Sequence, residues 1–342
     1  MADASRHPLG RSCLPMNPID MIRQSTSLRV GLSLLIAALL VVNACGTGES
    51  GSTATTTTTT TTSATMSRST TTSTSVAQPP TTAPVIERPT ATIDERVDIR
   101  GVRIHVRCVG HGDTTVLLIP GFGGDATSWA SIEPAVADHA RVCSYDRPGT
   151  GSSDAATSDA TFTTQAREVH TLLETIGEPG PYVAVGHSFG GAEAITFASL
   201  FADEVTGLVL VDASPTTWPA VLCAVVDDGS DGAAMLRGFC TSAFAPTGNS
   251  ERLDVVAAFT EAAQISSVGP LPMSVITATR REVPADLAAS QVERLNDAWN
   301  QGQQSWMALS SNARLVPVDD TGHNIQIDQP GVVIDEIIRL LP

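Results

Sequence analysis

From Ile93 to the C-terminus, short runs of apolar and β-branched residues alternate with longer stretches of helical periodicity. The short runs predict strands at 102–108, 115–119, 141–145, 182–186, 207–211, 273–277 and 314–318. The longer stretches predict helices at 164–176, 191–202 and 332–341. Because strands that alternate with helices form parallel sheets, the pattern predicts an α/β fold, with a mostly parallel central sheet flanked by helices.

One long insertion interrupts this alternation. Residues 214–270, between two of the predicted strands, are irregular and partly helical, and they contain Trp218, Cys223 and Cys240. We expect this insertion to form a cap over the ends of the strands.

The N-terminal region has the pattern of an export signal. An uncharged apolar run of 13 residues, Val30 to Val42, follows Arg23 and Arg29 and is too short to span a bilayer comfortably. The sequence Val42-Asn43-Ala44-Cys45 that ends it resembles the lipobox of bacterial lipoproteins. This resemblance implies that residues 1–44 are a signal peptide and that Cys45 is lipidated.

Residues 45–92 are dominated by Thr, Ser, Ala and Pro, with eight consecutive threonines from Thr55 to Thr62. Such a segment cannot form a core, so we expect a disordered linker between Cys45 and a folded domain at 93–342. The protein is therefore expected to be exported and held by its lipid anchor at the outer face of the cell membrane.

The charged residues exclude several function classes. All 20 basic residues of the 342-residue chain are arginine, which excludes mechanisms that need a lysine, such as a Schiff base. The formal net charge of −16 argues against nucleic acid as a partner, because phosphate binding needs clustered cations. The oligomeric state stays open.

The strongest motif is Gly186-His187-Ser188-Phe189-Gly190, between a predicted strand and a predicted helix. It has the G-x-S-x-G pattern of a nucleophile elbow in the strand-turn-helix context that this motif requires. A sharp turn needs residues with small side chains on both sides of the nucleophile, because the strand and helix cross closely there. The sequence thus indicates a nucleophilic serine at position 188.

The domain resembles the α/β-hydrolase superfamily over residues 93–342. Besides the elbow, three segments match that family in the expected order: 120–124 resembles its oxyanion loop with Pro120 in place of His, 146–153 its Asp-Arg-x-Gly-x-Gly-x-Ser turn, and 321–323 its C-terminal Gly-His. The resemblance implies the α/β-hydrolase fold.

A serine hydroxyl needs a base, and the base needs an acid to orient it. Among the seven histidines, His323 lies late in the chain, in a loop after the last strand, as the order serine, acid, histidine requires. The loop after the strand at 273–277, where most of the superfamily carries its acid, has no Asp at the usual place. Asp212, after the strand at 207–211, is the first candidate acid, followed by Glu282 and Asp286.

These residues predict a serine hydrolase that cleaves an ester bond of a small-molecule acyl substrate through an acyl-enzyme on Ser188; amide, thioester and acyl-transfer chemistry stay open. The main-chain N–H groups of Phe122 and Phe189 are the expected oxyanion donors. No metal or organic cofactor is expected. The alternative is a non-catalytic envelope lipoprotein with the hydrolase fold, which binds a ligand or partner.

Export also leads us to expect disulfides. In the superfamily's strand order, the strands that hold Cys108 and Cys143 are neighbours, which implies a Cys108–Cys143 pair. Cys223 and Cys240 would then close a loop within the cap.

Overall fold

The computed structural model describes residues 90–342. The predicted signal peptide (1–44), the lipidation site Cys45 and the linker up to residue 89 lie outside the described residues. Within the described part of the chain, no helix is both long enough and apolar enough to cross a membrane.

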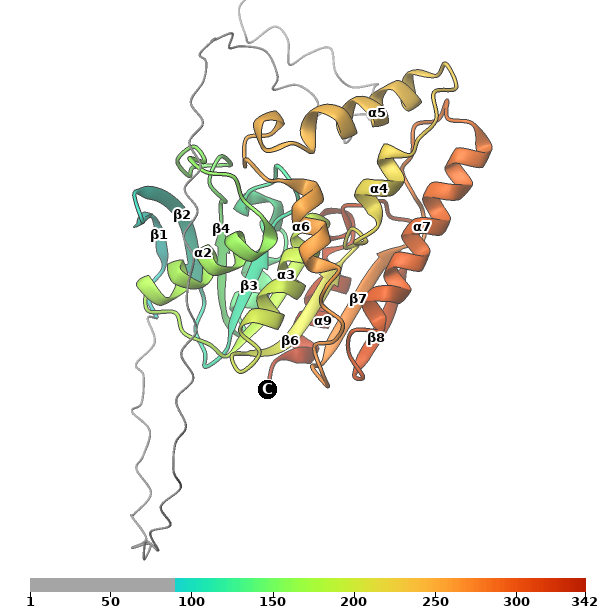
Figure 1. Ribbon diagram of the computed structural model, residues 1–342. Helices are drawn as coiled ribbons and strands as arrows, with labels where there is room; N and C mark the ends of the chain where they lie inside the picture. The colour runs from blue at the N-terminus through green and yellow to red at the C-terminus, as the bar shows by residue number, and fades with distance from the viewer. Residues whose placement is uncertain (1–89) are drawn as a thin grey trace, which may run out of the picture. The chain divides into compact units, whose positions relative to one another are not determined.

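The described residues form one eight-stranded sheet flanked by helices (Figure 1). Its order is β1-β2-β4-β3-β5-β6-β7-β8; β1 and β2 pair antiparallel, as do β2 and β4, and all other neighbours are parallel. The strands are β1 (Ile93–Ile99), β2 (Val102–Val109), β3 (Thr115–Ile119), β4 (Arg141–Tyr145), β5 (Tyr182–His187), β6 (Val205–Val211), β7 (Met273–Ala278) and β8 (Ala313–Val318).

The central strands are buried on both faces, as parallel strands usually are. In β3, Leu117 belongs to one apolar cluster and Val116 and Leu118 to the other, because successive side chains of a strand point to opposite faces. The first cluster packs the sheet against α2 (Phe162–Thr175), α3 (Phe189–Leu200) and α7 (Ala289–Met307). The second packs it against η2 (Ala126–Trp129), α1 (Glu133–Ala137) and α9 (Pro330–Leu340).

All seven predicted strands and all three predicted helices are present, with ends that differ by at most two residues. Besides the short helices η2, α1 and α8 (Ile325–Asp328), two longer elements of the described residues were not predicted. One is β1, a half-exposed strand whose sequence IDERVDI carries few apolar residues. The other is α7, 19 residues long, which has a largely polar sequence.

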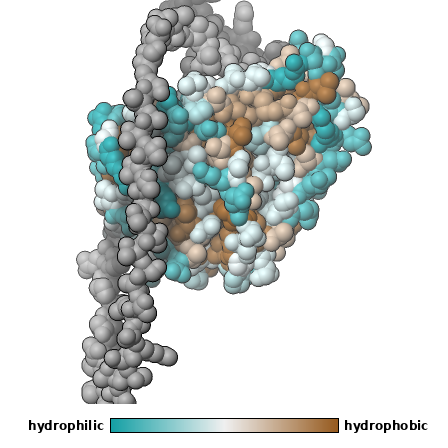
Figure 2. Space-filling model, in the orientation of Figure 1, coloured by the Kyte–Doolittle hydropathy of each residue, from teal (hydrophilic) through white to brown (hydrophobic). Residues whose placement is uncertain are grey.

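The segment between β6 and β7 contains three helices and one short turn of helix: α4 (Trp218–Cys223), α5 (Asp231–Ala243), η3 (Pro246–Gly248) and α6 (Val255–Ala262). In Figure 1, α4 and α5 lie beyond the carboxyl ends of the strands, where the sequence places a cap. A disulfide joins Cys223 at the end of α4 to Cys240 in α5. Figure 2 shows apolar surface gathered over α5, where Met235 is exposed, as is Val226 in the preceding loop.

The second disulfide joins Cys108 of β2 to Cys143 of β4. The two residues are directly opposite each other in the antiparallel pair, so the strand order brings them together. Within residues 90–342, these two cysteines and Glu178 form the group of donor side chains close enough to hold a metal ion. The disulfide takes up both thiols, so this group does not act as a thiolate site.

Candidate active site

Ser188 occupies a strained turn between β5 and α3. Its backbone is in the left-handed region (φ 55°, ψ −123°), and its side chain is nearly buried. The flanking glycines are required: a Cβ on Gly186 would lie 2.1 Å from the carbonyl oxygen of Gly190, and one on Gly190 would lie 2.3 Å from that of Pro120. The turn therefore has the geometry that the elbow motif predicts.

His323 connects this serine to a carboxylate. It lies in the loop between β8 and α8 (Ile325–Asp328), with Nε2 2.9 Å from Ser188 Oγ and Nδ1 2.7 Å from Asp212 Oδ2. Because an ionised carboxylate only accepts hydrogen bonds, Nδ1 carries the proton. Nε2 of the neutral ring is then the acceptor for the serine hydroxyl, which is the arrangement of a general base.

Asp212 follows β6 in a left-handed conformation (φ 42°) that aspartate tolerates, and its side chain is completely buried. Besides His323, it accepts hydrogen bonds from the Ala278 N–H (3.1 Å), the Trp299 indole (3.2 Å) and both terminal nitrogens of Arg281 (2.8 and 3.0 Å). Burial alone would raise the pKa of Asp212, but the hydrogen bond from His323 and the charge of Arg281 outweigh it and hold this pKa well below its ordinary value. The carboxylate is therefore ionised at neutral pH.

The other two candidate acids have partners other than His323. Glu282 forms an ion pair with Arg280 (3.9 Å) and is about one third exposed. Asp286 accepts a hydrogen bond from the main-chain N–H of Gly232 in α5 (3.1 Å). In the described part of the chain, neither carboxylate is hydrogen-bonded to His323, whereas Asp212 is.

One face of α7 supports the segment that follows β6. Trp299, Gln303 and Trp306 are spaced by four and three residues, so they share a face of the helix. Gln303 Nε2 and Trp306 Nε1 both donate to the carbonyl oxygen of Ala213 (2.9 and 3.3 Å), next to Asp212. The helix thus fixes the backbone that carries the carboxylate.

Sequence reasoning did not identify Arg281, Trp299 or Ser214 as parts of this site. Ser214 Oγ lies 3.3 Å from Ser188 Oγ. Arg281 is in the loop after β7, where the resemblance places the usual acid. The absence of an Asp from that loop was the one local indication that its residues have a different role. Nothing in the sequence near Trp299 indicates its contact with a residue 87 positions earlier.

His187 precedes the nucleophile and supports the loop of His323. Its ring lies 4.7 Å from the ring of His323, and its Nε2 donates to the carbonyl oxygen of His323 (3.0 Å). Burial, with a smaller contribution from His323, lowers the pKa of His187 to about 3. This histidine is therefore neutral at physiological pH and acts as a hydrogen-bond donor.

The glycine-rich loop after β3 passes next to Ser188. A Cβ on Gly121 would lie 3.3 Å from Ser188 Cβ, and the rings of Phe122 and Phe189 stack at 5.1 Å. The two segments whose main-chain N–H groups are the predicted oxyanion donors therefore meet beside the serine. Arg147, from the second glycine-containing motif, donates to the carbonyl oxygens of Pro120 and Gly121, so it holds this loop in place.

A buried charge network surrounds Arg147. Burial opposes its charged form, but the carboxylates of Glu193 (2.8 Å) and Glu251 (3.6 Å) outweigh this effect and raise its pKa. Glu251 also accepts hydrogen bonds from the Gly123 N–H (2.5 Å) and Gln165 Nε2 (3.2 Å). The loop is thereby attached to the segment between β6 and β7.

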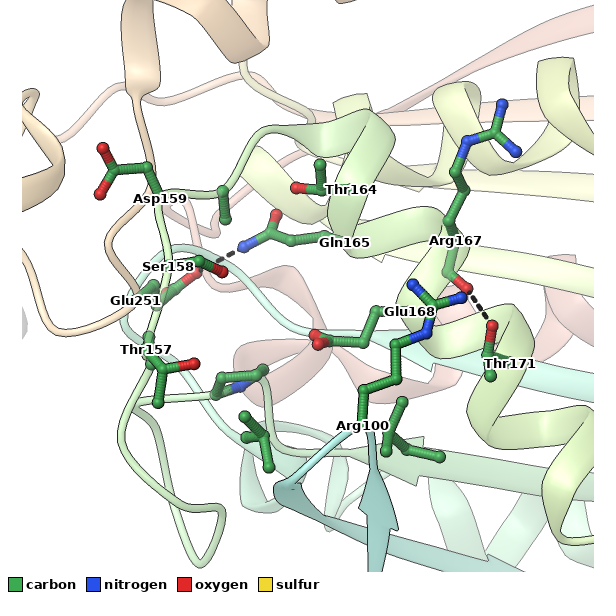
Figure 3. A pocket seen from close by; sticks show the side chains of 15 residues that line it. Arg100, Thr157, Ser158, Asp159, Thr164, Gln165, Arg167, Glu168, Thr171 and Glu251 are labelled. Carbon is green, nitrogen blue, oxygen red and sulfur yellow. Dashed lines mark hydrogen bonds between the residues drawn. The ribbon is translucent and has the colours of Figure 1, made fainter.

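Glu251 and Gln165 also line a cavity of about 330 Å³ (Figure 3). Arg100 and Glu168 lie close together in it, and burial, together with the charge of Glu193, raises the pKa of Glu168 to about 7. The residues that line this cavity do not include Ser188, Asp212 or His323. It is therefore separate from the hydrogen-bonded chain of those three residues.

Comparisons with known proteins agree with this architecture. A family model described as alpha/beta hydrolase fold matches residues 114–227. Over 102 residues, the chain is 35% identical to the dihydrolipoyllysine-residue acetyltransferase component of the acetoin cleaving system of Pseudomonas putida. This match covers 30% of the chain and 27% of that protein, so the chain spans only about a quarter of this relative.

Two solved structures have a similar fold. A probable hydrolytic enzyme from Pseudomonas aeruginosa is 20% identical with a TM-score of 0.53, covering 75% of this chain and 96% of that one. A thermophilic esterase from Thermogutta terrifontis is 19% identical with a TM-score of 0.51, covering 73% of this chain and 97% of that one. The sheet order, the matched segment and these neighbours together show that the described residues have the α/β-hydrolase fold.

Proposed function

We propose that this domain is a serine hydrolase that cleaves an ester through an acyl-enzyme on Ser188. The observation that carries the proposal is the chain of hydrogen bonds from Ser188 through His323 to Asp212, at 2.9 and 2.7 Å. The order of these residues along the chain, serine, acid, histidine, is that of α/β-hydrolases. Hydrolases and an esterase among the structural neighbours support the same activity.

In this mechanism Ser188 Oγ attacks the acyl carbonyl carbon as His323 Nε2 takes its proton. The N–H groups of Phe122 and Phe189 stabilise the oxyanion of the tetrahedral intermediate. His323 then returns the proton to the leaving alcohol, and the acyl group remains on Ser188. A water molecule, deprotonated by the same histidine, releases the acid and restores the serine.

The aromatic residues near Ser188 favour an apolar acyl group. Phe122 packs against Phe189 at 5.1 Å and edge-on against Phe239 of α5 at 6.2 Å. Phe189 packs in turn on Phe259 of α6 at 4.8 Å. We therefore expect an apolar acyl group, because an apolar chain gains free energy when it leaves water for contact with phenyl rings.

The alternative, a non-catalytic lipoprotein with this fold, has less support. A binding protein has no need for a strained serine, a histidine with its Nδ1–H fixed and an ionised acid in one hydrogen-bonded chain. The strain at Ser188 is a cost that a nucleophile requires and a binding surface does not.

The test is hydrolysis of p-nitrophenyl esters of graded acyl length by the wild type, Ser188→Ala and His323→Ala. We expect hydrolysis by the wild type, with a burst of p-nitrophenol when deacylation is slow, and loss of activity in both variants without loss of fold. Equal activity of Ser188→Ala and the wild type would refute the proposal.

A further inference from the structure

Arg281 forms a bidentate ion pair with Asp212. Its Nη1 donates to Oδ2 (2.8 Å) and its Nη2 to Oδ1 (3.0 Å), so both oxygens of the carboxylate are engaged by one planar cation. The oxygen that Nη1 contacts is also the one that accepts from His323 Nδ1. An arginine and the imidazole therefore share a single carboxylate oxygen.

The guanidinium itself is held in place. Its Nη2 also donates to the carbonyl oxygen of Ala278, and its carbon lies 4.7 Å from the centre of the Trp299 ring. The side chain is only 11% exposed. Solvent therefore screens the ion pair weakly, and the arginine has little freedom to leave Asp212.

This position has a consequence for proton transfer. In a Ser-His-Asp chain, the carboxylate stabilises the imidazolium that forms when the histidine takes the serine proton. A second cation on that carboxylate offsets part of its charge and repels the imidazolium. It also fixes the carboxylate, with Oδ2 toward the ring, before substrate arrives.

We propose that Arg281 is a positioning residue of the reaction, which fixes Asp212 toward His323 and sets the pH range in which His323 acts as a base. The inference rests on the proposed function. Arg281 stands in the loop after β7, where the superfamily's usual acid is expected, and the acid of this chain lies one strand away at Asp212. From this loop the arginine reaches across to hold Asp212.

Other titratable groups contact this histidine or the residues next to it in its loop. His187 is neutral at physiological pH and contacts both the ring and the carbonyl oxygen of His323. Glu282 packs against Gly322, and Arg280 is paired with Glu282. Asp328 of α8 accepts from the hydroxyl of Thr321 (3.2 Å). These groups remain when Arg281 is changed, so comparison between variants isolates the arginine.

The test replaces Arg281 by Gln and by Met, which remove the charge, and by Lys, which keeps the charge but cannot form the bidentate hydrogen bonds. Arg280→Gln is the matched control, because it removes a neighbouring, largely exposed arginine. Two quantities are measured in each variant: the pH dependence of kcat/KM for an ester, and the titration midpoint of the His323 ring by NMR without substrate.

We expect both midpoints to move to higher pH by on the order of one unit in the Gln and Met variants. In Arg281→Lys and Arg280→Gln we expect both midpoints to be unchanged. We also expect a lower kcat in Arg281→Lys, because an ammonium group cannot form the bidentate pair with Asp212. Unchanged midpoints in both neutral variants, or full kcat in Arg281→Lys, would overturn the inference. Because the NMR titration needs no substrate, an inactive wild type would count against the proposed function and leave this comparison intact.

Discussion

At the scale of single residues, Asp212 determines how the site works. Thr277, Ala278, Arg281, Trp299 and His323 all donate hydrogen bonds to its buried carboxylate. So many donors compensate for the loss of hydration and keep the group charged. A buried carboxylate of this kind orients the imidazole of His323 through its Nδ1–H.

Asp212→Asn tests this role. We expect kcat to fall by something on the order of 10⁴, because the amide favours the wrong imidazole tautomer. Glu282→Gln is the matched control and leaves kcat nearly unchanged. Circular dichroism and thermal unfolding of both variants separate a loss of chemistry from a loss of fold. A large loss in Glu282→Gln with a silent Asp212→Asn would transfer the role of the acid to the later loop.

The serine and histidine of this chain could be predicted because each lies in a short motif. The choice among Asp212, Glu282 and Asp286 could only be ranked, because it depends on which strand end faces His323. Arg281 and Asp212 are 69 residues apart, and no local pattern in the sequence indicates that they pair. Contacts between loops at the end of a sheet are decided by strand order, which periodicity does not encode.

At the scale of elements, burial on both faces made the central strands predictable. Strands such as β3 and β5 are buried along their whole length and are therefore continuous apolar runs. The edge strand β1 is half exposed, and its charged residues interrupt the apolar pattern from which a strand is predicted. Helix α7 has a narrow buried stripe that includes Trp299 and Trp306, and the rest of its surface is polar.

The disulfide between α4 and α5 supports a second prediction. Cys223 and Cys240 are 17 residues apart, and closing a loop of that length stabilises a fold by about 3 kcal/mol in the chain-entropy estimate. Replacing both by Ser should lower the free energy of unfolding by roughly that amount. Urea denaturation measures the loss, with unreduced and reduced wild type as controls. Equal stability of the variant and the oxidised wild type would contradict it.

At the scale of the whole molecule, the buried His187 and the partly buried Glu168 give opposite pH dependences of stability. Burial lowers the pKa of His187 from 6.5 to about 3, so only the unfolded chain gains its proton as pH falls between these values. Burial raises the pKa of Glu168 from 4.5 to about 7, so only the folded chain holds that proton in much of the same range. The His187 effect destabilises the fold as pH falls, and the Glu168 effect destabilises it as pH rises.

Glu168→Gln should remove the contribution of Glu168 to the pH dependence of stability. Between about pH 5 and 6.5, the free energy of unfolding of the variant should rise with pH, relative to the wild type, by up to about 1.4 kcal/mol per pH unit. Urea unfolding at several pH values measures the slope, and His187→Gln should change it in the opposite direction. The same slope in all three proteins would show that these groups do not titrate as described.

The predicted lipid anchor at Cys45 concerns residues outside the described part of the chain. Each buried CH₂ of an acyl chain contributes about 0.8 kcal/mol to membrane binding, so two or more chains anchor firmly. We predict that the wild type, expressed in a bacterium that processes lipoproteins, fractionates with membranes and that Cys45→Ala does not. A Cys45→Ala protein that stays with the membrane fraction would exclude this anchor.

The most direct test of the account is covalent labelling of Ser188. A fluorophosphonate reacts only with a serine that has both a base and an oxyanion hole, so it tests the assembled site without knowledge of the natural substrate. Intact mass spectrometry should show one added phosphonyl group on the wild type, mapped to Ser188, and none on Ser188→Ala or His323→Ala. A wild-type protein that stays unlabelled, or a label that persists in Ser188→Ala, would contradict the account.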